Sequence, residues 1–219
     1  MSRELLLLRH AKSDWPEGVA DYNRPLKKRG KQAAIDIGEW LLSQQLLPDW
    51  IISSPADRAR ETTEKVVKAL GSKKHGMVYF DDRIYEASLS QLKAVLTDCP
   101  RFKRRVLLVG HNPGLDELLL DLVDTELAYD ETGKILGTAH LARISLPEDW
   151  QDLPTHCGQL LNLISPKQLK PQEADLEQTA ELSDLIDPAA SPLQTEQTVT
   201  NASKLNSWFG WIKRTAKRN

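Results

Sequence analysis

Four consecutive leucines near the start of the chain, Leu5 to Leu8, constrain the fold more than any other feature of the sequence. A run without polar residues cannot alternate between a buried and a solvated face, so it predicts a strand buried on both faces, although a short buried helix has the same pattern. The run ends at Arg9 and His10, side chains that are rarely buried without a partner. Ligands of open α/β sheets bind at the carboxyl ends of strands, so this pair is placed for an anion, or it is an ordinary polar loop.

The same pattern returns in the middle of the chain. The apolar run Val106 to Val109 is followed by Gly110-His111-Asn112-Pro113-Gly114. If both strands are parallel members of one sheet, His10 and His111 lie at the same edge of that sheet.

The other predicted elements alternate between strands and helices. Apolar residues at helical spacing predict helices over about 31–45, 55–70 and from about 90, and another after Pro113. Short apolar or alternating runs predict strands at 50–52, 77–80, 140–146 and 159–164, the last two without a helix between them. This order predicts an α/β three-layer sandwich with a mostly parallel central sheet, an antiparallel edge and helices on both faces.

Two of these helices have a recognisable start signal. Ser54 and Asn112 each precede a proline, which predicts an N-cap followed by the first helical residue. Arg58 then falls in the first turn, where the helix macrodipole disfavours a cation. A bound anion would offset this cost, and an exposed arginine paired with a carboxylate such as Glu61 would explain it equally well.

Charge is distributed unevenly along a chain whose formal net charge is only -2. Residues 171–203 contain seven acids, no Lys or Arg and no aromatic residue, whereas residues 204–219 contain five bases and no acid. We therefore expect a folded domain over 1–168, an acidic flexible linker over 169–203 and a basic amphipathic C-terminal segment over 204–219. That segment has tryptophans on its apolar face, so it either docks a partner or a membrane surface, or packs back on the domain.

Several classes of protein do not fit this composition. Charges of the folded domain balance, which argues against a nucleic-acid binder. The only cysteines, Cys99 and Cys157, make neither a disulfide framework nor a zinc site, and we expect no metal and no cofactor. The chain has no secretory leader and no apolar stretch long enough to span a membrane, so we expect a cytoplasmic protein.

The residues that follow the strands share one kind of chemistry. Forked guanidiniums and N–H donors match the spread negative charge of a phosphoryl group. A histidine among cations has its neutral form favoured, and a neutral imidazole has the free lone pair that covalent catalysis on phosphorus needs. The set consists of Arg9, His10, Arg24, Arg58 and His111, with Lys12 and Asn112 beside them.

Several ordered motifs resemble the histidine phosphatase (phosphoglycerate mutase-like) superfamily. They are Leu8-Arg9-His10-Ala11, Ser54-Pro55 with Arg58-Ala59 and Glu61-Thr62, and Gly110-His111-Asn112-Pro113-Gly114. Residues 9–15, Arg24-Pro25-Leu26 and Tyr85-Glu86-Ala87-Ser88 resemble its SixA-type phosphohistidine phosphatase branch. The resemblance covers about residues 4–165. The wider superfamily has glycine at the position of Ala11, and the SixA-like branch shares the alanine.

The resemblance implies a role for each site residue. His10 is the nucleophile that becomes transiently phosphorylated, and Arg9, Arg58 and His111 complete the phosphate pocket. Arg24 and Asn112 are secondary phosphate contacts, and Lys12 adds charge. The general acid is Glu86, with Asp14 as its competitor, and either could be an ordinary solvated carboxylate.

These implied roles lead to one expected function and two alternatives. We expect a phosphatase that acts on protein phosphohistidine, so that its partner is a phosphorylated protein. The alternatives are a small-molecule phosphomonoesterase or phosphoglycerate-mutase-like enzyme, acting on a small phosphorylated substrate, and a non-catalytic phosphate-binding regulatory module. Ester hydrolysis needs a well-placed acid, whereas phosphohistidine leaves as imidazole, which protonation makes easier. This mildly favours phosphohistidine as the substrate.

Overall fold

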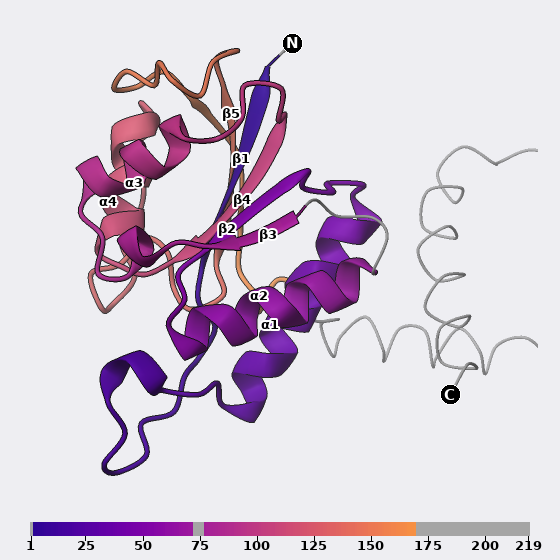
Figure 1. Cartoon of the computed structure of the whole chain (residues 1–219), viewed down its shortest axis with the longest axis vertical. Helices are drawn as coiled ribbons and strands as arrows, with labels where there is room; N and C mark the ends of the chain where they lie inside the picture. Colours follow the sequence, from indigo (N-terminus) through magenta and orange to yellow (C-terminus); the bar gives the residue numbers. More distant parts are fainter. Residues whose placement is uncertain (1, 72–76, 170–219) are drawn as a thin grey trace, which may run out of the picture. The chain divides into compact units, whose positions relative to one another are not determined.

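Six strands form one mixed sheet in the order β3-β2-β4-β1-β5-β6 (Figure 1). The computed structural model describes residues 2–71 and 77–169. The strands are β1 (Arg3–Arg9), β2 (Trp50–Ser53), β3 (Met77–Phe80), β4 (Arg105–Gly110), β5 (Leu141–Leu146) and β6 (Gln159–Ile164). The first four are parallel, and β5 and β6 add an antiparallel edge beside β1. The predicted fold class is confirmed.

Helices cover both faces of this sheet. α1 (Lys28–Ser43) and α2 (Asp57–Leu70) lie on one face, and α3 (Leu89–Thr97) and α4 (Gly114–Leu122) lie on the other (Figure 1). Two short 3₁₀ segments, η1 (Asp21–Asn23) and η2 (Asp82–Ile84), lie in the loops after β1 and β3. These bounds agree with the predicted helices to within a few residues, and α1 begins earlier than expected, at Lys28.

The leucine run of β1 supplies both hydrophobic cores. Leu6 and Leu8 pack in the cluster with α1 and α2, whereas Leu5 and Leu7 pack in the cluster with α3 and α4. All four leucines are fully buried, as the absence of alternation predicted. At about 1.5–3 kcal/mol for each fully buried leucine, this strand contributes strongly to the stability of both layers.

The register between β1 and β4 places the two histidines together. Arg9 pairs with Gly110, and the next residue, His10, donates its backbone N–H to the carbonyl of Gly110 at 3.0 Å. His10 and His111 therefore leave adjacent parallel strands at the same sheet edge, as predicted.

Both predicted helix starts are wrong by a few residues. α2 begins at Asp57 after Ala56, and α4 begins at Gly114 after Pro113, and neither N-cap residue makes a side-chain cap. The hydroxyl of Ser54 contacts His111, and the amide of Asn112 donates to Asp116 and Leu136. Each of these two side chains therefore also contacts a distant part of the chain, although Ser54 still accepts from the nearby N–H of Ala56.

The C-terminal part of the chain lies outside the described residues. This applies to most of the predicted linker over 169–203 and to the whole predicted amphipathic segment over 204–219. The domain boundary at 168 stays a prediction. Within residues 2–71 and 77–169, no helix is long and apolar enough to cross a membrane.

Candidate active site

Two buried histidines face each other at the carboxyl edge of the sheet. The ring centroids of His10 and His111 are 5.1 Å apart, and the ring planes are tilted by 50°. The two residues are 8% and 7% exposed, respectively. Neither ring contacts a carboxylate, so the pair lacks the partner that a buried, charged imidazole requires.

The ring of His10 is held in one orientation by its own loop. Its Nδ1 lies 2.8 Å from the carbonyl oxygen of Ala11. A carbonyl oxygen can only accept, so Nδ1 carries the hydrogen and Nε2 keeps a free lone pair. Burial, together with the neighbouring His111, Arg58 and Arg9, lowers the pKa of His10 to about 3. The neutral tautomer with a nucleophilic Nε2 is therefore the stable form at neutral pH.

The backbone after His10 is fixed by helix α2 and helix α1. The hydroxyl of Thr62 accepts from the backbone N–H of Ala11 at 2.9 Å and donates to the carbonyl of Arg58 at 2.6 Å. A Cβ at Gly30 would lie 2.2 Å from the carbonyl oxygen of Lys12, so only glycine allows this loop to approach α1 so closely. Thr62 belongs to one of the motifs identified in the sequence, but no local pattern predicts that it holds the backbone after His10.

A serine hydroxyl sets the orientation of His111. Its Nε2 lies 2.8 Å from the Oγ of Ser54, which also accepts from the backbone N–H of Ala56 at 3.3 Å. We assign the Ser54 hydroxyl hydrogen to the bond with Nε2, which places the imidazole hydrogen on Nδ1. That Nδ1 is buried and has no hydrogen-bond partner among the described residues.

Electrostatics keep His111 neutral as well. Burial and the nearby Arg58 and Arg9 lower its pKa to about 3, and Asp21 opposes this shift. His111 can therefore offer a neutral, unpaired N–H donor to an anion that enters between the two rings.

Arg58 is buried at the start of α2 and has a carboxylate partner. Its Nη1 donates to the backbone carbonyl of Asp21 at 2.7 Å, and its Nη2 lies 2.9 Å from the Asp21 carboxylate. Glu61, the partner suggested by the sequence, instead pairs with Lys31. The hydroxyl of Tyr85 donates to the same Asp21 carboxylate at 3.0 Å. The sequence missed Asp21 and Tyr85 because each is far from Arg58 along the chain.

Arg9 reaches the site from the last position of β1. Its Nη1 donates to the carbonyl of Leu136 at 2.7 Å, and its buried Nε has no partner among the described residues. The buried carboxylate of Asp116 holds this loop, because it accepts from the backbone N–H groups of Ile135 and Leu136. Arg9 thus retains unpaired donor capacity in a fixed position.

The three residues predicted to assist phosphate binding, Asn112, Arg24 and Lys12, differ in their contacts. The amide nitrogen of Asn112 donates to the carboxylate of Asp116 at 2.6 Å and to the carbonyl of Leu136 at 3.0 Å. Asn112 therefore supports the loop that contains Leu136 and does not offer donors to phosphate. Arg24 donates to Ser13, to the carbonyl of Asp14 and to Asp21, so it chiefly holds the segment after β1. Lys12 is exposed and contributes only its charge.

The two candidate acids differ in electrostatics. Asp14 is half-exposed and lies 3.2 Å from Lys27, and its pKa is lowered first by the N–H of Trp15 and then by Lys27. A carboxyl with a lowered pKa is ionised at neutral pH and is a poor proton donor. Glu86 is exposed and has φ 51°, an uncommon conformation for a residue other than glycine. It directly follows Tyr85, whose ring meets His111 edge-on at 5.6 Å.

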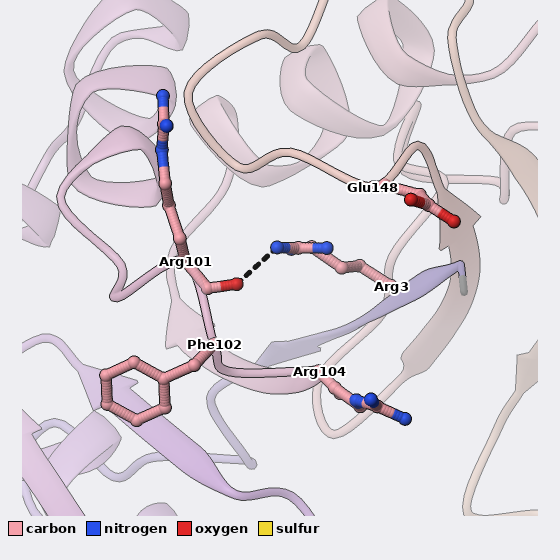
Figure 2. Close-up of a pocket in the computed structure, with 5 residues that line it drawn as sticks. All are labelled: Arg3, Arg101, Phe102, Arg104 and Glu148. Carbon is pink, nitrogen blue, oxygen red and sulfur yellow. Dashed lines mark hydrogen bonds between the residues drawn. The ribbon is translucent and has the colours of Figure 1, made fainter.

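One pocket of the described chain lies away from this site. It has a volume of about 340 Å³ and is lined by Arg3, Arg101, Phe102, Arg104 and Glu148, at the amino ends of the strands (Figure 2). Figure 2 shows that the side chains of Arg101, Phe102 and Arg104 point away from one another. They do not converge on a common point as the residues around His10 do. No group of three metal-ligating side chains occurs among residues 2–71 and 77–169.

Known proteins are similar to this chain in sequence and in fold. Residues 5–98 match the model of the histidine phosphatase superfamily, branch 1. An uncharacterised protein of Mycobacterium tuberculosis is 27% identical over 164 residues, which cover 73% of this chain and 100% of that protein. A structure from Nakamurella multipartitia, assigned as the phosphohistidine phosphatase SixA, has a TM-score of 0.65 at 25% identity and covers 76% of this chain and 97% of its own. The SixA structure from Agrobacterium tumefaciens has a TM-score of 0.64 at 25% identity, with 76% and 99% covered.

Fold and site together define the class of protein. The six-stranded α/β sheet carries paired histidines and arginines at its carboxyl edge, and its fold is similar to that of the SixA structures. Together with the match of residues 5–98 to the superfamily model, this fold supports a phosphatase.

Proposed function

We propose that this protein removes a phosphoryl group from protein phosphohistidine through a phosphorylated His10 intermediate. The observation that carries the proposal is the hydrogen bond from His10 Nδ1 to the Ala11 carbonyl, which leaves the Nε2 lone pair free among cations. Resemblance to SixA structures supports the choice of phosphohistidine as substrate.

In the first step, Nε2 of His10 forms a bond to phosphorus while the bond from phosphorus to the leaving group breaks. Arg9, Arg58 and the Nδ1–H of His111 donate to the phosphoryl oxygens, whose charge is spread in the transition state. The His10 Nδ1–H stays on the Ala11 carbonyl, which stabilises the positive charge that the ring acquires. In the second step, the oxygen of a water forms a bond to phosphorus while the bond from phosphorus to Nε2 breaks. The electron pair of that bond returns to Nε2, the protons of the water leave with inorganic phosphate or pass to solvent, and His10 is neutral again.

The leaving group distinguishes phosphohistidine from a phosphate ester. A protonated phosphohistidine releases a neutral imidazole, so it needs little help from an enzyme acid. Asp14 is ionised and engaged with Lys27, so it is unsuited to protonate an alkoxide. Glu86 is the remaining candidate acid, and its carboxyl is exposed.

A second candidate function follows from Glu86. Its strained backbone is pinned on both sides, because Tyr85 contacts His111 and Ser88 forms a capping box at the start of α3. A carboxyl carried on such a fixed backbone could protonate the oxygen of a leaving alcohol, which would make the protein a small-molecule phosphomonoesterase.

Phosphate release from a histidine-phosphorylated protein, compared with a panel of sugar phosphates and other small esters, separates these functions. We expect turnover of the phosphoprotein, an acid-labile phosphoenzyme and the loss of both in His10→Ala. Labelling that survives in His10→Ala would refute the mechanism. Turnover of esters alone would favour the monoesterase, and phosphate binding without turnover would favour a regulatory module. The cytoplasmic location and the absence of nucleic-acid binding stay predictions.

A further inference from the structure

An exposed tryptophan stands beside the candidate active site. Trp15 is 65% exposed and belongs to the segment between β1 and α1, which projects past the carboxyl edge of the sheet (Figure 1). A scattered exposed apolar residue needs no explanation. Trp15, however, is held in place, because the guanidinium carbon of Arg24 lies 3.9 Å from its ring centroid. One face of the indole is thus fixed by a cation–π contact.

The segment that carries Trp15 is tied at both ends. Ser13 and Leu26 form an antiparallel bridge, and the N–H of Asp14 donates to the carbonyl of Pro25 at 2.8 Å. Arg24 adds hydrogen bonds to Ser13 Oγ at 2.9 Å and to the Asp14 carbonyl at 3.0 Å. The fold therefore presents the indole from a pre-organised support, which lowers the ordering cost of binding a partner.

Two chains of contacts connect this segment to the catalytic groups. In the first, Trp15 contacts Arg24, which pairs with Asp21 at 2.8 Å, and Asp21 pairs with Arg58. In the second, the partly exposed Tyr22 packs against Tyr85 with ring centroids 5.1 Å apart, and Tyr85 meets His111. The exposed aromatic residues are thus continuous with the phosphate pocket.

We propose that Trp15 and Tyr22 form a docking surface for the polypeptide that surrounds the phosphorylated side chain of the substrate. This inference rests on the proposed function, because it names what the enzyme contacts outside the phosphoryl group. Two side chains, Arg24 and Asp21, separate Trp15 from Arg58, so a phosphoryl group bound between the imidazoles does not touch the indole. An extended polypeptide advances about 3.5 Å per residue, so the residues that flank the phosphorylated side chain can reach from the phosphoryl site to Trp15.

The chemistry of the surface suits a protein partner. Tryptophan, tyrosine and arginine are the residues most enriched at the energetic centres of protein interfaces. A small sugar phosphate has hydroxyl groups to offer and would gain little from an indole. A polypeptide offers aliphatic and backbone surface that an indole can cover.

The test compares two substrates that share one leaving group. The full-length enzyme is assayed on a protein chemically phosphorylated on histidine with phosphoramidate, and on the free amino acid phosphohistidine. Trp15→Ala is expected to lower kcat/KM on the protein about 10- to 30-fold, mainly through KM, because interface tryptophans commonly contribute this much. Activity on the free amino acid should stay within about twofold, and Trp15→Phe should retain most activity on the protein.

A matched control is available at the other end of the sheet. Phe102 is 76% exposed beside the pocket of Figure 2, and Phe102→Ala should leave both activities unchanged. An unchanged kcat/KM of Trp15→Ala on the protein would overturn the docking surface while the proposed function stands. Equal losses on both substrates would overturn it too, since Trp15 would then only support the catalytic loop. A wild-type enzyme inactive on the phosphoprotein would overturn the proposed function as well.

Discussion

Folding stability should fall steeply as the pH is lowered, because two histidines are buried in their neutral form. The folded-state pKa values of His10 and His111 are about 3, below the ordinary value of 6.5 that applies in the unfolded chain. As pH falls below 6.5, the unfolded state therefore binds protons that the folded state does not, and stability is lost. The loss continues until the pH reaches the folded pKa of about 3, and stability is complete above about 6.5.

The size of this effect is set by the unfolded state. At pH 5.0 the unfolded imidazole is about 1.5 units below its own pKa, and each unit corresponds to about 1.36 kcal/mol. Each histidine should thus cost the fold about 2 kcal/mol between pH 7.5 and 5.0, whatever the folded pKa is below about 4. Together His10 and His111 should cost about 4 kcal/mol.

Urea unfolding at the two pH values measures this difference. The free energy of unfolding is compared for the wild type, His10→Asn, His111→Asn and the double variant, in buffers without phosphate because a bound anion would stabilise the fold. Carboxylates such as Glu4 contribute equally in every protein and cancel. Each single variant should lose about 2 kcal/mol less than the wild type on acidification. Variants that lose as much as the wild type would refute buried neutral imidazoles.

Two further substitutions test the groups that orient the site. Ser54→Ala should lower kcat about tenfold with little change in KM in steady-state assays, because His111 loses the hydrogen bond that keeps its hydrogen on Nδ1; an unchanged kcat would contradict this tautomer. Thr62→Val should lower the free energy of unfolding by about 1–3 kcal/mol, since the buried N–H of Ala11 loses its acceptor. In the control Thr97→Val, a hydroxyl at the surface of α3 is lost, and a cost as large as that of Thr62→Val would argue against this reason.

The parts of the fold that the sequence predicted correctly depend on local patterns. An apolar run such as Leu5 to Leu8 is compatible with little except a strand or helix buried on all sides. A histidine that directly follows such a strand must lie at the carboxyl end of the strand. The common edge of His10 and His111 followed from strand direction alone, and the parallel pairing of β1 with β4 confirms it.

The parts that were missed depend on contacts between distant residues. Ser54 has the signature of an N-cap, yet its hydroxyl is taken by His111, 57 residues away. Asp21 is an ordinary acidic loop residue until the fold brings it to Arg58 and Tyr85. Nothing in local propensity distinguishes such a carboxylate from a solvated one, so only the assembled structure identifies it.

Four consecutive identical leucines in β1 do not by themselves determine the register in which β1 pairs with β4. Sliding β1 by one residue along β4 would exchange the two cores while still burying a leucine at most positions. The polar ends remove the ambiguity: Glu4 pairs with Arg105 at 2.6 Å and with Arg143 at 2.5 Å, and the N–H of His10 donates to Gly110. A one-residue slip would bring Arg9, in place of His10, opposite His111. The alignment of His10 with His111 is therefore encoded by ion pairs at the far end of β1.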